Sequence, residues 1–293
     1  MKLSGIFLGI IGVILFSTKA VMVKLAYQYN VTSMHLLLFR MLFSLPFYLG
    51  ILFYLIKIEK KKLNVKTKDY LWLLFFGFIG YYLASYFDFL GLQYINASLE
   101  RIILFVYPTL VLLINKLFLK KEITKRQIGA IALTYFGVII AFGNRNQVVE
   151  YDAILGGALV FLSALTYASY IVGSGWLIPK FGVVMFTSFA MVVSTICVCI
   201  HYLISDGSSF TIYPTEVYYL GFAMAIIATL IPSFLVSYAI ELIGASNFSI
   251  LGSIGPFSTI ILAVIFLEEE INVNQIIGVI IVVLGIRIVT KKG

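Results

Sequence analysis

Residues 95–140 read INASLERIILFVYPTLVLLINKLFLKKEITKRQIGAIALTYFGVII, and a related stretch follows 148 positions later without a gap. Residues 243–288 read IGASNFSILGSIGPFSTIILAVIFLEEEINVNQIIGVIIVVLGIRI. Thirteen of the 46 aligned positions are identical. Apolar composition alone produces matches of leucine and isoleucine, but it does not produce matches of rarer residues in one register. The aligned rarer residues are Pro108/Pro256, Glu122/Glu270 and Gln127/Gln275.

The composition around this repeat is that of a membrane protein. Of the 293 residues, 61% are hydrophobic and 12% are charged, and the mean hydropathy is +1.05. Soluble domains average about 45–50% apolar and about 25% charged residues. The composition therefore excludes a soluble globular protein, a disordered chain and a disulfide scaffold. The net charge of +8 does not indicate a nucleic-acid partner, because the basic residues lie in short loops between apolar runs.

Ten apolar runs are long enough to cross a bilayer, whose hydrocarbon core of about 30 Å needs roughly 20 helical residues. The predicted fold is therefore an all-α membrane protein with ten transmembrane helices. The spans are residues 4–27, 33–56, 70–92, 99–118, 126–143, 153–176, 183–204, 217–241, 247–267 and 272–289.

Loop charges predict the orientation, because Lys and Arg gather on the cytoplasmic side. Both chain ends fall on the basic side and are predicted to be cytoplasmic, in a multi-pass protein of the plasma or inner membrane. The basic side carries Lys2, Lys57, Lys60, Lys61, Lys62, Lys66, Lys68, Lys116, Lys120, Lys121, Lys125, Arg126, Lys180, Arg287, Lys291 and Lys292. The opposite side carries Arg145 and the acidic run Glu268-Glu269-Glu270.

Each repeat, residues 1–146 and 147–293, holds five predicted spans. Because five is odd, the second repeat starts on the opposite side of the membrane, and the two repeats are predicted to be inverted. Pro108 and Pro256 each lie about nine residues into their spans, near the midplane at 1.5 Å per residue. Paired interruptions of this kind are typical of the binding site of an alternating-access transporter, although plain helix packing also explains them.

Charged residues within the predicted spans gather in the first repeat. They are Lys19, Lys24, Arg40, Asp88, Glu100 and Arg101. Charges inside a bilayer cost several kcal/mol, so they usually face a partner or water. The positive surplus favours an anionic or carboxylate-bearing substrate, because Arg makes bidentate contacts with carboxylates. Arg40 is the first candidate ligand, because its own span holds no acidic residue, and Lys19 is the second.

The other intramembrane charges have two interpretations each. Lys24 is either a ligand or a side chain that snorkels to the interface. Arg101 either binds substrate or pairs with Asp88 to hold two spans together. Glu100 is either a proton-coupling carboxylate, a role open to Asp88 as well, or a charge that satisfies a helix N-terminus.

Neutral polar side chains are expected to complete the site. The predicted substrate-binding residues of this kind are Tyr82, Tyr86, Tyr107, Tyr167 and Ser237. Hydrogen bonding between helices is the alternative role for any one of them.

The motifs together resemble the drug/metabolite transporter superfamily, and in particular its EamA-like family. The resemblance rests on ten spans, two inverted halves, and a proline followed by FL-x-x-E-I-x-x-x-Q in both halves. It implies a central cavity lined by spans 1–4 and 6–9, with spans 5 and 10 packed outside. It also implies export of amino acids or related metabolites, coupled to protons or to exchange.

The sequence therefore predicts a secondary active transporter that exports a small anionic or zwitterionic metabolite by alternating access. It contains no nucleotide-binding loop, zinc motif or nucleophile elbow, so we expect neither an enzyme nor a cofactor nor a metal. The alternatives are efflux of hydrophobic cations or drugs, and a non-transporting membrane partner or sensor.

Overall fold

The computed structural model describes residues 2–58, 65–95, 97–142, 151–205, 213–267 and 273–290. Every regular element within these ranges is helical. Part of the predicted charge pattern lies outside the described residues, namely Lys60, Lys61, Lys62, Arg145, Glu268, Glu269, Glu270, Lys291 and Lys292.

The helices of residues 2–142 follow the first five predicted spans closely, and several spans consist of two or three helical pieces. The pieces are α1 (Leu3–Tyr27), α2 (Ser33–Phe53), η1 (Tyr54–Ile58), α3 (Thr67–Gly77), η2 (Phe78–Leu83), α4 (Ala84–Tyr94), α5 (Ala97–Leu104), α6 (Tyr107–Leu119) and α7 (Lys125–Phe142).

The remaining helices follow the last five predicted spans in the same way. They are α8 (Tyr151–Phe181), α9 (Val183–Ser205), α10 (Thr215–Ala225), η3 (Ile226–Leu230), α11 (Ile231–Ile243), α12 (Ala245–Leu251), η4 (Gly252–Ile254), α13 (Gly255–Leu267) and α14 (Val273–Thr290).

The two prolines that match between the repeats, Pro108 and Pro256, both lie at the start of a helix. Pro108 is the second residue of α6 and Pro256 is the second residue of α13. Proline fits there because the first turn of a helix has no partner for its N–H groups. The helix before Pro108 ends at Leu104, and the one before Pro256 passes through the single 3₁₀ turn η4.

Two π-helical turns also fall in corresponding places. η2 and η3 begin 148 residues apart, at Phe78 and Ile226, and each divides a long helix into two pieces. A π-helical turn is rare, and it frequently marks a functional site inside a membrane or soluble helix.

In the described part of the chain, seven helices are long and apolar enough to cross a membrane: Leu3–Tyr27, Ser33–Lys57, Thr67–Tyr94, Ile154–Phe181, Val183–Ser205, Thr215–Ile243 and Ala245–Phe266. The other three predicted spans correspond to α5 with α6, to α7 and to α14. Because of the break before Pro108, the fourth predicted span contains the short apolar helix Tyr107–Leu119 rather than one long helix. The tenth predicted span, α14, contains the short apolar helix Ile276–Ile288.

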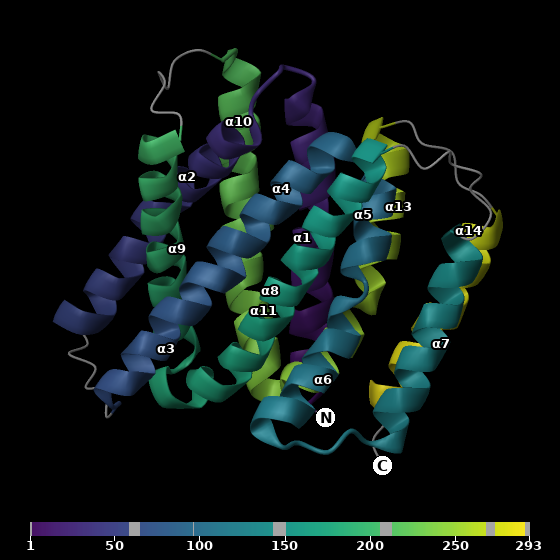
Figure 1. The fold of residues 1–293 in the computed structure, drawn as a ribbon. Helices are drawn as coiled ribbons and strands as arrows, with labels where there is room; N and C mark the ends of the chain where they lie inside the picture. The colour runs from purple at the N-terminus through teal and green to yellow at the C-terminus, as the bar shows by residue number, and fades with distance from the viewer. Residues whose placement is uncertain are drawn as a thin grey trace.

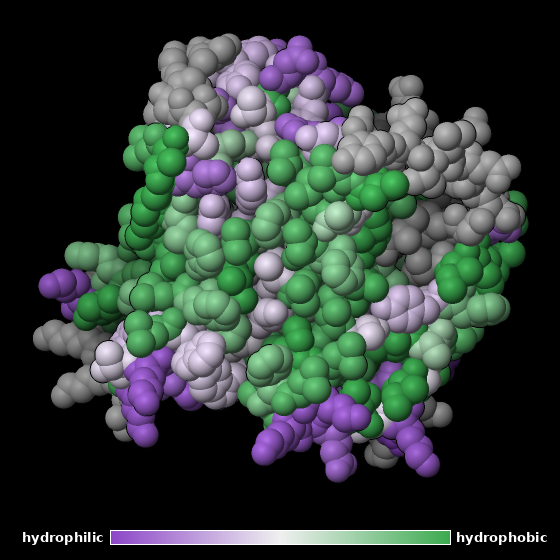
Figure 2. All heavy atoms as spheres, in the orientation of Figure 1, coloured by the Kyte–Doolittle hydropathy of each residue, from purple (hydrophilic) through white to green (hydrophobic). Residues whose placement is uncertain are grey.

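The surface between the two ends of the molecule is hydrophobic. In Figure 2, green side chains form a continuous band and the hydrophilic residues gather at its two ends. Large apolar side chains are exposed to match: Ile204 is 81% exposed and Phe118 is 78% exposed. Soluble proteins rarely expose apolar patches of this extent. The chain is therefore a multi-pass membrane protein.

The helices pack as a bundle with one pair at its edge. α1 packs along α11 and α4 packs along α8, while α7 and α14 pack mainly against each other and stand apart from the rest (Figure 1). This agrees with the expectation that the fifth and tenth spans lie outside the central group. Figure 1 also places the N and C termini at the same end of the molecule.

Candidate functional site

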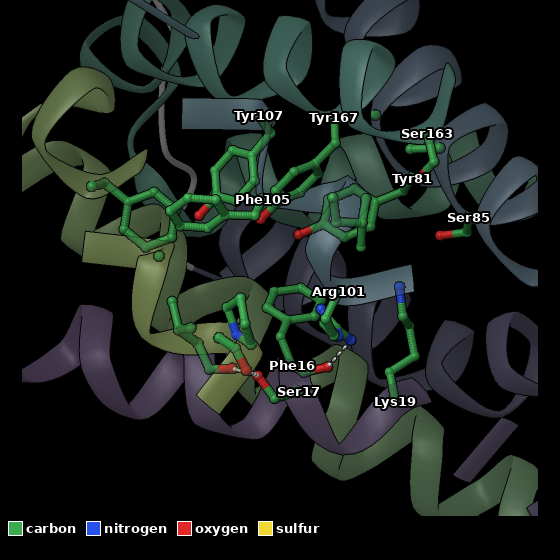
Figure 3. A pocket seen from close by; sticks show the side chains of 18 of the residues that line it. Phe16, Ser17, Lys19, Tyr81, Ser85, Arg101, Phe105, Tyr107, Ser163 and Tyr167 are labelled. Carbon is green, nitrogen blue, oxygen red and sulfur yellow. Dashed lines mark hydrogen bonds between the residues drawn. The ribbon is translucent and has the colours of Figure 1, made fainter. Parts of the chain in front are cut away.

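A cavity of ≈ 90 Å³ lies among α1, α2, η2, α4, the α5–α6 break, α8 and the α12–α13 break. In Figure 3, Lys19 and Arg101 approach it from one side, and Tyr81, Tyr107 and Tyr167 approach it from the other. A single water molecule needs about 10–15 Å³ of space measured in this way. The cavity is therefore large enough for several waters or a small polar metabolite.

The interrupted helices meet at this cavity. Leu104, Phe105 and Tyr107 line it from the first break, and Gly252 and Pro256 line it from the second. An interrupted helix inside a membrane leaves backbone groups that need a partner or a wet cavity. The Ser17 hydroxyl of α1 donates to the Gly255 carbonyl at 3.2 Å, which joins α1 to the start of α13 at the second break.

Arg40 is the most deeply buried charge on the cavity wall, with a relative exposure of 1%. Its Nη2 donates to Ser85 Oγ at 2.7 Å, and its guanidinium lies 5.0 Å from the centre of the Phe89 ring. Its Nε has no hydrogen-bond partner, and no carboxylate among the described residues forms an ion pair with it. Arg40 therefore retains donor capacity beside the cavity.

Two ion pairs flank the cavity, and they differ from the pairing considered from the sequence. Lys19 Nζ lies 2.5 Å from Asp88 Oδ2, and Arg101 Nε lies 3.0 Å from Glu100 Oε2. Asp88 therefore takes Lys19 as its ion-pair partner rather than Arg101. The reason is packing, because α1 runs beside α4 and brings the Lys19 ammonium to the carboxylate.

The two carboxyl groups lie on neighbouring helices. Asp88 is on α4 and Glu100 is on α5, and these two helices pack against each other. Both carboxyl groups are buried, so each depends on its ion-pair partner to offset the loss of water.

Aromatic rings form the rest of the wall. Tyr107 and Tyr167 meet edge to face with their ring centres 5.5 Å apart, and Tyr81 meets Tyr170 in the same way at 4.9 Å. Gly80 permits the second contact, because a side-chain carbon at that position would lie 2.3 Å from the Tyr170 ring.

The structure separates the predicted site residues into three groups. The group that lines the cavity is Lys19, Arg40, Arg101, Tyr107, Tyr167 and Pro256. Asp88 and Glu100 lie behind Lys19 and Arg101, and Pro108 follows Tyr107 just outside the wall.

Three predicted residues lie elsewhere. The Tyr82 hydroxyl hydrogen-bonds to His201 Nδ1 at 3.0 Å, and the Tyr86 ring stacks edge to face on the same histidine. Ser237 accepts a hydrogen bond from the Thr187 hydroxyl at 2.7 Å. Sequence could not place them, because a tyrosine or serine on any buried helix face satisfies the same pattern.

The sequence prediction also omitted lining residues. Ser163 and Phe16 lie on the cavity wall, as does Phe105 at the helix break. Ser163 stands four residues before Tyr167, and this spacing puts both on one helix face. Among the described residues, no group of three or more His, Cys, Asp or Glu side chains could hold a metal ion.

Comparison with known proteins now gives the family. The model of the EamA-like transporter family matches residues 3–143 and again residues 154–291. The uncharacterized transporter YcbK of Bacillus subtilis is 29% identical over 275 residues, which are 92% of this chain and 87% of YcbK. An uncharacterized transporter of Archaeoglobus fulgidus is 26% identical over 238 residues, which are 78% of this chain and 80% of that transporter.

A crystal structure superposes on the chain with a TM-score of 0.78. The match covers 99% of this chain and 97% of that one at 13% sequence identity, so it bears on the fold alone. The two family matches together span nearly all of the sequence and coincide with a helical membrane protein built around a cavity that charged and aromatic side chains line. The chain belongs to the EamA-like transporter family.

Proposed function

We propose that this transporter moves a small anionic or zwitterionic metabolite across the membrane by alternating access. The observation that carries the proposal is Arg40, a buried guanidinium on the cavity wall with an unpartnered Nε and no carboxylate ion pair among the described residues. Buried charges are normally paired or fully hydrogen-bonded. A substrate carboxylate at Arg40 supplies the missing partner.

The remaining cavity charges support an anion over a cation. Lys19 and Arg101 share the wall with Arg40, whereas Asp88 and Glu100 do not line it. Three cationic groups therefore attract a bound carboxylate directly, whereas the same three groups repel a cationic substrate. The cavity volume of ≈ 90 Å³ suits a metabolite of the size of an amino acid.

Alternating access is supported by the repetition in the fold. The helix breaks, the π-helical turns η2 and η3, and the two family matches each occur once in either half of the chain. We infer two inverted five-helix repeats, residues 1–146 and 147–293, that move against each other around the cavity. Both termini are proposed to be cytoplasmic, in the plasma or inner membrane. The proposed direction is export, and it rests on the resemblance to the EamA-like family. Asp88 and Glu100 are the proposed proton carriers.

The second candidate function is efflux of hydrophobic cations. The observation in its favour is the aromatic wall formed by Phe16, Phe105, Tyr107 and Tyr167, because aromatic faces attract cations. The three basic groups on the same wall oppose it.

The test is a thermal-shift panel on detergent-purified protein with acetate, succinate, L-alanine, L-glutamate and tetraphenylphosphonium. A ligand that binds only the folded protein raises its melting temperature. We expect at least one of the carboxylates to raise it, and Arg40→Met to abolish that shift while the variant still inserts and stays monodisperse. The matched control is Arg126→Met, at an exposed arginine of α7. Stabilisation by tetraphenylphosphonium alone, unchanged in Arg40→Met, contradicts the anion proposal.

A further inference from the structure

The charged side chains on the cavity wall are all basic. Lys19, Arg40 and Arg101 line the cavity, and none of the described residues on its wall is an aspartate or a glutamate. All three cations belong to the first half of the chain. The residues 148 positions later, in the second half, are the uncharged Tyr167, Ser188 and Ser249. The wall is therefore positive where the first half forms it and uncharged where the second half does.

The nearest carboxylates do not face the cavity. Asp88 Oδ2 lies 2.5 Å from Lys19 Nζ, and Glu100 Oε2 lies 3.0 Å from Arg101 Nε. The two carboxylate side chains are 1% and 0% exposed, whereas the two cations are 12% and 11% exposed. Arg101 is held in addition by the Phe16 carbonyl, to which its Nη2 donates at 3.5 Å. The cavity therefore meets only the positive ends of the two ion pairs.

The charges around the cavity are out of balance by one. Asp88 and Glu100 match Lys19 and Arg101, whereas no carboxylate among the described residues forms an ion pair with Arg40. One positive charge is therefore in excess. A bound monoanion cancels this charge. A zwitterion has no net charge, so its ammonium group remains uncompensated inside the membrane, where an unbalanced charge is costly.

The structure of an α-amino acid increases this mismatch, because its ammonium group is bonded to the carbon next to the carboxylate. A carboxylate bound by the cations brings the ammonium group to the same side of the cavity. Lys19 and Arg101 approach from that side, and Tyr81, Tyr107 and Tyr167 approach from the other (Figure 3). The ammonium group therefore lies nearer to like charges, which repel it, than to the aromatic faces that attract it.

A hydroxyl group in place of the ammonium group fits the same position. It is uncharged, so the cations do not repel it, and it can both donate and accept a hydrogen bond. The wall offers it the hydroxyl groups of Ser17, Ser85 and Ser163 as well as those of the three tyrosines. These hydroxyl groups can also accept a hydrogen bond from an ammonium group, but they supply no negative charge to balance it.

We propose that the substrate is a small carboxylate without an ammonium group, such as a 2-hydroxy acid, and that the cavity discriminates against α-amino acids. This rests on the proposed function, because it needs a carboxylate at the basic side of the cavity. It narrows the anionic or zwitterionic class to its anionic member. The selectivity comes from repulsion of the wrong ligand rather than from an added attraction for the right one.

The experiment uses pairs of ligands that differ only in the group on the second carbon. Purified wild-type protein in detergent is titrated with L-lactate and L-alanine, and with 3-phenyl-L-lactate and L-phenylalanine, and calorimetry gives each Kd. We expect the hydroxy acid of at least one pair to bind about tenfold or more tightly than its amino acid. Arg40→Met should abolish binding of that hydroxy acid. Arg126→Met, at an exposed arginine of α7, should keep it.

A carboxylate added to the basic side should shift the preference toward the amino acid. Ser17 lines the cavity from α1, two residues before Lys19. Ser17→Asp adds a negative charge there, and Ser17→Asn adds a side chain of the same shape without the charge. We expect the affinity for L-alanine, relative to L-lactate, to be higher in Ser17→Asp than in Ser17→Asn. Where Ser17→Asp does not stay folded, the affinities of the wild type decide.

The outcomes separate this inference from the proposed function. Equal affinities within both pairs, or tighter binding of the amino acids, overturn the inference, while transport of a carboxylate-bearing metabolite stands. An equal preference in folded Ser17→Asp and Ser17→Asn also overturns it, because the charge of the wall then does not control the choice. Absence of binding by all four ligands and by acetate and succinate overturns the anionic or zwitterionic substrate class, and the inference falls with it.

Discussion

The hydroxyl of Tyr107 lies directly against Gly252, so that a side-chain carbon at position 252 would be 1.4 Å from the hydroxyl oxygen. Tyr107 opens α6 after the first helix break, and Gly252 opens η4 at the second. The two breaks, which sequence alone shows only as separate prolines, thus touch each other on the cavity wall. A change at either residue is expected to act on both halves of the chain.

Gly252→Ala should lower the melting temperature and impair anion binding, because the new methyl group and the Tyr107 hydroxyl cannot both keep their places. Tyr107→Phe removes the colliding oxygen and leaves the nearest ring carbon 2.8 Å from the added methyl group. The double variant should therefore recover part of the loss. Strictly additive melting-temperature changes in this double-mutant cycle would contradict the contact.

Ser85→Ala should destabilise the protein by about 1–3 kcal/mol, because it leaves a buried guanidinium N–H of Arg40 without its acceptor. The matched control is Ser163→Ala, which removes a hydroxyl from the same cavity without touching Arg40. Thermal unfolding in the absence of ligand measures the difference. Equal melting temperatures for the two variants would show that the Arg40–Ser85 hydrogen bond contributes little.

An ion pair joins the start of α3 to the end of α8. Lys180 Nζ lies 2.5 Å from Asp69 Oδ1 and 4.2 Å from the centre of the Trp176 ring. Asp69 also accepts the Lys66 backbone N–H at 3.1 Å, which caps the helix. Asp69→Ala should therefore lower the melting temperature more than Lys180→Met does, and Asp69→Asn should fall between them.

The salt dependence separates the two roles of Asp69. The Asp69–Lys180 ion pair is partly exposed, so raising the ionic strength should weaken it. The difference in melting temperature between the wild type and Lys180→Met should therefore become smaller. The lower melting temperature of Asp69→Ala should persist in part, because this variant also loses the hydrogen bond from the Lys66 backbone N–H, which screening by salt does not remove. Unfolding of all three variants at low and high sodium chloride provides the measurement.

Ser237→Ala should leave anion affinity unchanged, because Ser237 contacts Thr187 and does not line the cavity. The loss of this buried hydrogen bond should still cost about 1 kcal/mol of stability. Thr187→Val should produce the same two results. A weaker anion affinity in Ser237→Ala, with stability intact, would return Ser237 to the proposed binding site.

The helices themselves were predictable from sequence, as were the breaks near Pro108 and Pro256. The cost of placing polar backbone in hydrocarbon makes every apolar run of sufficient length a helix. A proline lacks the N–H that continues a helix, which favours a break before Pro108 and Pro256, although α2 runs through Pro46. Both effects act locally along the chain. For the same reason, Lys19, Arg40 and Arg101 could be identified as unusual from their depth in the spans alone.

The partners of these charges depended on the packing of distant helices. Arg40 meets Ser85 across 45 residues, and Lys19 reaches Asp88 because α1 lies beside α4. Tyr82 and Tyr86 turn to His201 rather than to the cavity for the same kind of reason. Sequence determined which residues are buried in the membrane and at what depth. Only the tertiary structure decided which way each one faces, because the rotation of a helix about its axis is set by its neighbours.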